Sequence, residues 1–308
     1  MISSYNEYDP LKKIIVGTAT YANWPVLDPV FRAEAENTLW KESPLPSGPV
    51  PQWIIDEAEQ DLQKLCAALT DRGVEVVRPE PMNFQVHDGL YNYCPRDRFI
   101  VHGDVIIDPA MMYPCRDMEY QCYIDYLEDA SKIIHMPRNA GMVLDAANVL
   151  RITKDKWLFL ESASGNRAAY DWLCKQLPDV DIELCNFYAG VHIDSTIVAL
   201  NEDCFVVNGS RVPGIEQLPR HLQGKEVLFV NDVVPQGFHE YPYASKWIAL
   251  NMLSIDPKTV VVDAKQEDMI AVLEDHFGMN VVPLELRHSR TLGGGFHCVT
   301  LDLVRTAK

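Results

Sequence analysis

One order of elements recurs along the chain. A pair of short apolar strands is followed by an amphipathic helix and then by another strand, as in Met142–Ile152, Trp157–Glu161, Asn166–Leu177 and Val180–Phe187. The unit occurs about five times, at roughly 60 residues per unit, although no letter pattern repeats. Periods of this order are typical of propellers and solenoids. No break in composition marks a boundary, so we expect a single α/β domain over residues 1–308.

The clearest helix is predicted over Trp53–Arg72, where Ile54, Leu62 and Leu69 share one apolar stripe and Gly73 follows the last turn. Further strands are predicted at Leu11–Gly17, Val74–Arg78, Val227–Val230, Thr259–Asp263, Val281–Leu286 and Gly293–Val304. Hairpins are predicted over Arg98–Pro109 and from His192–Leu200 to Cys204–Asn208. Further helices are predicted at Glu119–Ile133, Gly214–Leu222, Tyr243–Leu253 and Gln266–Phe277.

A long segment rich in proline and tryptophan separates the first strand from the first helix. It runs over Thr18–Gln52 and includes Trp24 and Trp40. Loops of this length are often lids or binding loops. A plain surface excursion is the alternative.

The formal charge of −17 narrows the range of partners. Such a field repels nucleic acid and anionic membrane surfaces, and it attracts amines and guanidinium compounds. Simple solubility explains the acidity equally well.

No apolar run approaches the length of a membrane helix, and Met1–Gly17 lacks the pattern of a signal peptide. Eight cysteines are present without a CxxC pair, which argues against structural zinc. We therefore expect reduced thiols and a cytoplasmic location.

Three short segments place a polar group where a strand meets a loop. Asp97 ends Cys94-Pro95-Arg96-Asp97, and Asp145 lies within the apolar run Leu144–Asn148. Each has a structural alternative, a surface carboxylate for Asp97 and a backbone-bonded one for Asp145. His192 and Asp194 alternate, so on a strand they share a face and could transfer protons or bind a metal. A hydrogen-bonded structural histidine is the alternative.

The fourth segment is Leu292-Gly293-Gly294-Gly295-Phe296-His297-Cys298. Three glycines allow a sharp turn or a close approach, and a cysteine after such a turn can be an exposed nucleophile. The spacing differs from that of phosphate-binding loops. On a strand, His297 would point away from Cys298. Zinc held by Cys298, His192 and Asp194 is a weaker alternative, since no motif supplies two ligands.

Together these segments resemble the amidinotransferases of the arginine:glycine type, within the guanidine-modifying superfamily of arginine deiminase-like enzymes. The resemblance rests on the opening Ser3–Leu11, on the four segments above and on Ser245-Lys246-Trp247 followed by Asn251, and it covers almost the whole chain. It implies a five-bladed α/β propeller, or pentein, of repeated ββαβ units with pseudo-fivefold symmetry.

The resemblance also implies roles and substrates. Cys298 would be the nucleophile, His192 the general acid and base, and Asp145 the carboxylate that orients His192. The remaining implied residues bind substrate: Asp97 and Asp194 the guanidinium, Arg211 a carboxylate, and Ser245 the pocket wall. The donor would be L-arginine, the product L-ornithine and the acceptor a primary amine, with no metal or organic cofactor. A homodimer is one assembly that we consider.

The chain departs from the family at Asn148, where a second acid is common, and it is shorter near Met82–Tyr91 and Ile133–Met142. These departures leave the acceptor open. An arginine deiminase-type hydrolase and a non-catalytic arginine-binding propeller are the alternative functions.

Overall fold

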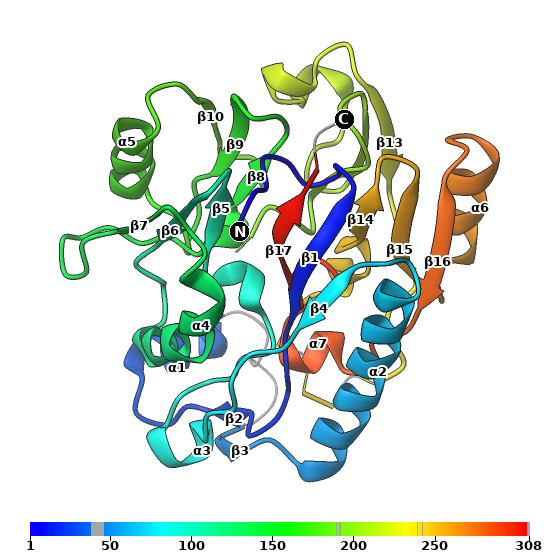
Figure 1. Cartoon of the computed structure of the whole chain (residues 1–308). Coiled ribbons are helices and arrows are strands. Elements are labelled where there is room, and N and C mark those ends of the chain that lie inside the picture. The colour runs from blue at the N-terminus through cyan, green and yellow to red at the C-terminus, as the bar shows by residue number, and fades with distance from the viewer. Residues whose placement is uncertain (38–45, 189, 191, 239, 242, 307–308) are drawn as a thin grey trace.

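The computed structural model describes residues 1–37, 46–188, 190, 192–238, 240–241 and 243–306. Within this part of the chain lie five three-stranded sheets of one design (Figure 1). In each sheet an antiparallel pair is joined by a third strand that runs parallel to the middle one. The structure is therefore α/β, and the strand pattern of the repeated unit predicted from the sequence recurs in all five sheets.

The strands group by sheet. The sheets are β17 (Thr300–Arg305), β1 (Leu11–Val16) and β4 (Glu75–Val77); β5 (Ile100–His102), β6 (Val105–Asp108) and β7 (Lys132–His135); β8 (Val149–Arg151), β9 (Lys156–Leu160) and β10 (Asp181–Cys185); β11 (Ile197–Ala199), β12 (Cys204–Asn208) and β13 (Glu226–Val230); and β14 (Leu253–Asp256), β15 (Thr259–Asp263) and β16 (Asn280–Leu284).

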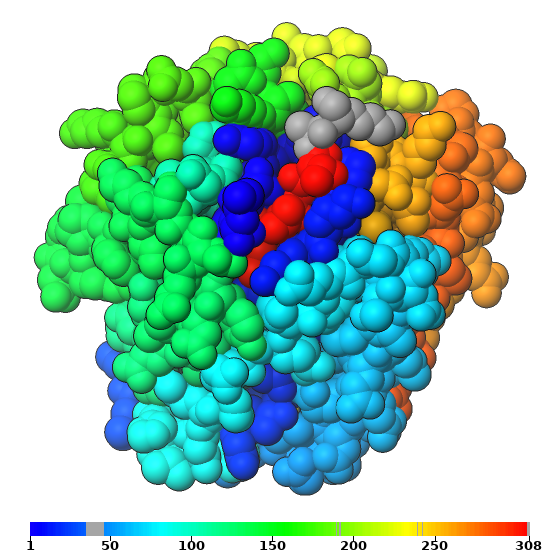
Figure 2. All heavy atoms as spheres, in the orientation of Figure 1, coloured from blue at the N-terminus to red at the C-terminus, as the bar shows by residue number. Residues whose placement is uncertain are grey.

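The first sheet combines the two ends of the chain. β17 pairs antiparallel with β1, from Leu11 opposite Arg305 to Val16 opposite Thr300. Figure 2 shows these first and last segments side by side at the centre of one face, with the other segments around them.

The long helix forms as predicted. α2 (Gln52–Thr70) buries Ile54, Ile55, Ala58, Leu62, Leu65 and Leu69, and Gly73 follows it with a φ of +77°. A positive φ is the conformation that ends helices and that glycine adopts without strain. α5 (Arg167–Gln176) and α6 (Glu267–Asp275) lie in the crossovers of two further sheets. No helix in the described part is both long and apolar enough to cross a bilayer.

Three predicted helices are wrong. Glu119–Ile133 is instead the end of a 3₁₀ helix, η2 (Pro114–Tyr123), then α4 (Ile124–Leu127) and the strand β7. Gly214–Leu222 holds two short 3₁₀ helices, η4 (Ile215–Gln217) and η5 (Arg220–Leu222). Tyr243–Leu253 contains η6 (Lys246–Leu250) and then the start of β14, which the sequence reading missed. Apolar periodicity does not distinguish these tight turns from α-helix, because side-chain contacts elsewhere decide the winding.

Three predicted strands are too long at their first ends. Met142–Ile152, His192–Leu200 and Gly293–Val304 reduce to β8, β11 and β17. The 3₁₀ helix η3 (Ala146–Asn148) precedes β8, and turns precede β11 and β17. His192, with a φ of +47°, and Gly293, with a φ of +78°, depart from extended backbone. The expectation that His192 and Asp194 share a strand face is therefore wrong, as is the one that His297 lies opposite Cys298 on a strand.

The described part of the segment predicted as a lid contains short elements. It contains β2 (Asn23–Trp24), α1 (Pro29–Asn37) and β3 (Gly48–Pro49), whereas Trp40 lies outside the described residues. Phe31 of α1 packs against Tyr113 and Tyr243, with ring centroids 5.4 and 5.9 Å away. The segment thus lies against other parts of the chain rather than apart from them.

Candidate active site

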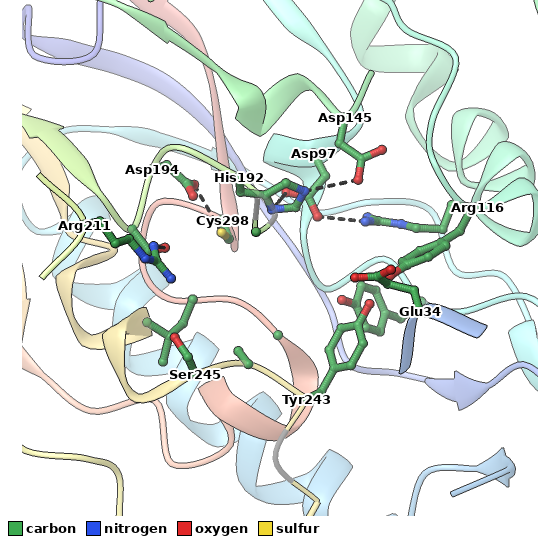
Figure 3. Close-up of a pocket in the computed structure, with 17 residues that line it drawn as sticks. Glu34, Asp97, Arg116, Asp145, His192, Asp194, Arg211, Tyr243, Ser245 and Cys298 are labelled. Carbon is green, nitrogen blue, oxygen red and sulfur yellow. Dashed lines mark hydrogen bonds and ion pairs between the residues drawn. The ribbon is translucent and has the colours of Figure 1, made fainter. Parts of the chain in front are cut away.

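All seven residues singled out in the sequence line one cavity of about 250 Å³. They are Asp97, Asp145, His192, Asp194, Arg211, Ser245 and Cys298. Figure 3 shows His192 and Cys298 near the middle, Arg211 and Ser245 on one side, and Arg116, Glu34 and Tyr243 on the other.

Most of these residues occupy equivalent positions in the repeated sheets. In each sheet, the turn that precedes the first strand contributes to the cavity: Asp97 before β5, Asp145 before β8, His192 and Asp194 before β11, Ser245 before β14, and Cys298 before β17. Arg211 differs, since it follows β12. Each of the five repeats therefore supplies at least one segment of the cavity wall.

Cys298 is held by its backbone and by its sulfur. Its N–H donates to Oδ1 of Asn251 at 2.8 Å, and its Sγ donates to Oδ2 of Asp194 at 3.2 Å. The side chain is 1% exposed. Burial first, and then Asp194 and Asp97, raise the pKa of the Cys298 thiol well above its usual value, so the resting group is a neutral thiol.

His192 lies between two carboxylates. Its Nε2 is 3.1 Å from Oδ2 of Asp145, and its Nδ1 is 3.6 Å from Oδ1 of Asp97. Burial alone lowers the pKa of His192, but Asp97 and Asp145 outweigh burial and raise it to about 9. The imidazole is therefore mostly protonated at neutral pH and can donate a proton.

Asn148, the departure noted in the sequence, supports His192 from behind. Its Oδ1 accepts the backbone N–H of His192 at 3.2 Å and the hydroxyl of Ser164 at 2.8 Å. Its amide donates to the carbonyl of Leu160 at 2.9 Å and to Oγ of Ser162 at 2.8 Å. Asn148 is fully buried and outside the cavity lining, so it acts in this structure through the backbone of His192.

Asp194 joins Cys298 to a histidine that the sequence reading set aside. Nδ1 of His297 lies 2.8 Å from the same Asp194 oxygen that accepts the thiol, and Nε2 lies 3.2 Å from Oε2 of Glu7. Burial would raise the pKa of Asp194, but the hydrogen bond and charge of His297 lower it to about 2. Asp194 is thus an anion beside the sulfur.

The two carboxylate oxygens of Asp97 differ in their hydrogen bonding. Oδ2 accepts from Nη1 of Arg116 at 2.7 Å. Oδ1 is buried without a hydrogen-bond partner among the described residues. A buried carboxylate oxygen at the cavity is suited to accept an N–H from a bound cation.

Arg211 provides a cationic end to the cavity. Its Nη1 donates to Oγ of Ser195 at 3.2 Å and to Oγ1 of Thr196 at 2.7 Å, and its guanidinium lies 4.3 Å from the ring centroid of Tyr188. None of these partners neutralises its charge, so Arg211 can bind a carboxylate.

The sequence reading missed part of the cavity wall. The missed residues include Glu34, Tyr91, Tyr113, Arg116 and Tyr243. They come from the lid segment and from loops without a motif, so no local signal marked them.

One group of side chains has the composition of a metal site. Ligand atoms of Asp97, His192 and Cys298 lie within 4.8 Å of one another, with Asp97 in place of the Asp194 weighed in the sequence. Metal binding needs a thiolate and a neutral imidazole. The raised pKa values of both groups oppose that state and suit thiol chemistry better.

No family model matches the sequence. Inosamine-phosphate amidinotransferase 1 of Streptomyces griseus is 38% identical, covering 100% of this chain and 98% of that protein. Mitochondrial glycine amidinotransferase of Xenopus tropicalis is 27% identical, covering 99% and 83%.

Solved structures agree with these relatives. The structure of inosamine-phosphate amidinotransferase StrB1 from Streptomyces griseus matches with a TM-score of 0.91 and 36% identity, over 100% of this chain and 98% of that one. DDAH from Pseudomonas aeruginosa, at 14% identity, matches with a TM-score of 0.66 over 95% and 99%, which shows a shared fold.

Fold, cavity and relatives together define a transferase that moves amidino groups. The chain belongs to the amidinotransferase family.

Proposed function

We propose that this amidinotransferase takes the amidino group of L-arginine onto Cys298, releases L-ornithine, and then passes the group to a primary amine. The observation that supports this most is the contact of one buried thiol with Asp194, beside an imidazole held between two further carboxylates. These are the groups needed to bind a planar cation and attack its central carbon.

The donor enters as a guanidinium cation. Asp97 and Asp194 receive its N–H groups, and Arg211 with the nearby Ser245 takes its carboxylate end. The cation offsets the two carboxylates that suppress ionisation of Cys298, so donor binding lowers the pKa of the thiol. The thiol proton is released to solvent as the cation binds, and Asp194 stays an anion that accepts an N–H of the donor.

The thiolate then attacks the guanidinium carbon, forming a carbon–sulfur bond. His192, protonated because its pKa is about 9, gives its proton to the departing nitrogen as the carbon–nitrogen bond breaks. L-ornithine leaves, and a cationic amidino group stays on Cys298. Asp145 keeps His192 oriented through this step.

The second half-reaction repeats these steps in reverse order, with the acceptor amine in place of ornithine. Neutral His192 accepts a proton from the acceptor, whose nitrogen attacks the amidino carbon and expels the thiolate. Water must be kept from the intermediate, since its attack would hydrolyse it. We assign this exclusion to the lid segment, whose Phe31 packs on two tyrosines of the cavity wall.

The proposal extends to the architecture. Five sheets of one topology, each giving one turn to a common cavity, are what a five-bladed α/β propeller would present. A cytoplasmic location and a homodimer stay predictions of the sequence.

Product analysis tests the chemistry. The protein is incubated with arginine labelled in its guanidino group, with and without a panel of primary amines, and the products are identified by mass spectrometry. Amine-dependent ornithine release, with label on one amine, is the expected result. Citrulline formed without an amine would identify the hydrolase alternative, and no product with unmodified Cys298 would point to another donor.

A further inference from the structure

The 3₁₀ helix η2 stands out by its length. It runs over ten residues, Pro114–Tyr123, whereas such helices rarely exceed three or four. With three residues per turn, side chains at positions i and i+3 lie directly above one another. Arg116 and Glu119 are such a pair, and both are buried.

This stacking lets the two side chains form a bidentate ion pair. Nε of Arg116 donates to Oε1 of Glu119 at 2.7 Å, and Nη2 donates to Oε2 at 3.0 Å. Two parallel charge-assisted bonds fix the plane of a guanidinium as well as its position.

The remaining edge of Arg116 faces the cavity wall. Nη1 donates to Oδ2 of Asp97 at 2.7 Å, Nη2 also donates to the carbonyl of Cys94 at 3.2 Å, and the guanidinium lies 5.4 Å from the ring centroid of Tyr91. Both edges of Arg116 are therefore occupied by protein groups. Unlike Arg211, it offers no free fork to a substrate carboxylate.

We propose that Arg116 and Glu119 are positioning residues that hold the carboxylate of Asp97 ionised and turned so that Oδ1 receives an N–H of the bound guanidinium. The inference rests on the proposed function of Asp97 as a donor-binding residue. Oδ1 is buried and has no hydrogen-bond partner among the described residues, although Nδ1 of His192 lies 3.6 Å away, and it is the atom that this clamp presents.

Charge and orientation are separate effects of the clamp. Burial raises the pKa of Asp97, while His192 and Arg116 oppose that rise and Asp145 adds to it. Further titratable groups nearby are the thiols of Cys94 and Cys298, the phenol of Tyr91 and the carboxyl of Glu119. Arg116 therefore supplies the charge, and Glu119 supplies the direction in which Arg116 points.

Variants can separate the two effects. Arg116→Gln removes the charge, so the pKa of Asp97 should rise and the acid limb of donor kcat/KM should move to higher pH. Glu119→Gln weakens the paired hydrogen bonds to Arg116 but keeps Arg116 cationic, so the acid limb of donor kcat/KM should not move to higher pH. Both should raise the donor KM about tenfold or more, because small misplacements at a reacting centre are costly.

Two further variants guard against misfolding. Arg116→Gln leaves Glu119 buried without its cation, so the double variant Arg116→Gln/Glu119→Gln keeps the pair neutral and should show the same acid-limb shift. Arg98→Lys is the matched control, since Arg98 is fully buried and ion-paired with Asp108 but does not line the cavity. It should change thermal stability without changing the pH profile.

A binding measurement separates this inference from the identity of the donor. Methylguanidine, the smallest substituted guanidinium, is titrated into the Cys298→Ser protein by NMR with and without the Arg116 and Glu119 changes. Weaker binding in folded variants supports the clamp even if arginine proves not to be the donor. Unchanged methylguanidine binding in both variants, or an activity loss in Arg116→Gln that is equal at every pH, would overturn it.

Discussion

The sulfur of Cys298 lies 3.2 Å from Oδ2 of Asp194, and its hydrogen bond goes to that carboxylate. The imidazole of His192 faces Asp145 and Asp97 instead. The thiol therefore has no adjacent base that activates it at rest. In the proposed mechanism it ionises only when a cation enters the cavity, which couples reactivity towards the donor to donor binding.

The first prediction concerns this thiol. Cys298→Ser should lower turnover by at least about a thousandfold, because a serine hydroxyl is a far weaker nucleophile. Intact-mass analysis with donor alone should show an amidino adduct on the wild-type protein and none on the variant. Cys204→Ser, a buried thiol outside the cavity lining, is the control and should keep the adduct.

The second prediction concerns pH. His192 must be protonated to release ornithine, so the rate of the first half-reaction should fall as pH rises through about 9. Asp145→Asn removes one of the three carboxylate charges that raise the pKa of His192, so this basic limb should move to lower pH. Single-turnover rates across pH 6–10 measure it. A basic limb at the same pH in the wild type and in Asp145→Asn would mean that a group other than His192 donates the proton.

The third prediction concerns stability. The pKa of Asp194 is lowered to about 2 in the folded protein, below an ordinary value of about 3.8. Its contribution to folding is therefore present above about pH 4 and is lost as pH falls through about 2. Asp194→Asn should flatten the acid part of the unfolding profile followed by circular dichroism. A profile as steep as that of the wild type would contradict it.

The fourth prediction concerns the donor's carboxylate. Arg211→Gln should raise the KM for arginine by about tenfold to a hundredfold and change kcat less, because the contact is uniform binding. Agmatine, which lacks the carboxylate, tests the assignment. Its KM should exceed that of arginine with the wild-type protein and should barely change in the variant. An equal penalty for both donors would place the carboxylate elsewhere.

The fifth prediction concerns Asn148. Asn148→Asp removes the amide that donates to the carbonyl of Leu160 and buries a charge beside it. We expect a loss of about 1–3 kcal/mol in the free energy of unfolding, measured by urea denaturation. Donor and acceptor preferences should stay the same, because Asn148 does not line the cavity. Changed preferences at unchanged stability would refute this structural role.

The sequence predicted the site better than it predicted the elements around it. Cys298, His192 and the three aspartates were identified because motif and family resemblance mark them, and all of them line the cavity. The same reading placed His192 and Asp194 on a strand, which the positive φ of His192 contradicts. Alternation along a sequence cannot reveal a turn that long-range contacts, such as the one from Asn148, hold in place.

Arg116 shows a different limit. It follows Asp97 by 19 residues, and only folding brings its Nη1 to 2.7 Å from that carboxylate. The sequence reading expected an α-helix from Glu119 onward, and an α-helix would not stack Arg116 over Glu119 as a 3₁₀ helix does. The winding follows from the ion pairs, which are not visible in local propensity.

The pairing of β1 with β17 has a consequence for the order in which the site forms during synthesis on the ribosome. Cys298 lies just before β17, so in a growing chain it follows His192 and the aspartates, and its position in the cavity is fixed only when β17 pairs with β1. Contacts between such distant positions form slowly. A nascent chain therefore carries the acids of the site before it carries Cys298, and the cavity is complete only after the first sheet has formed.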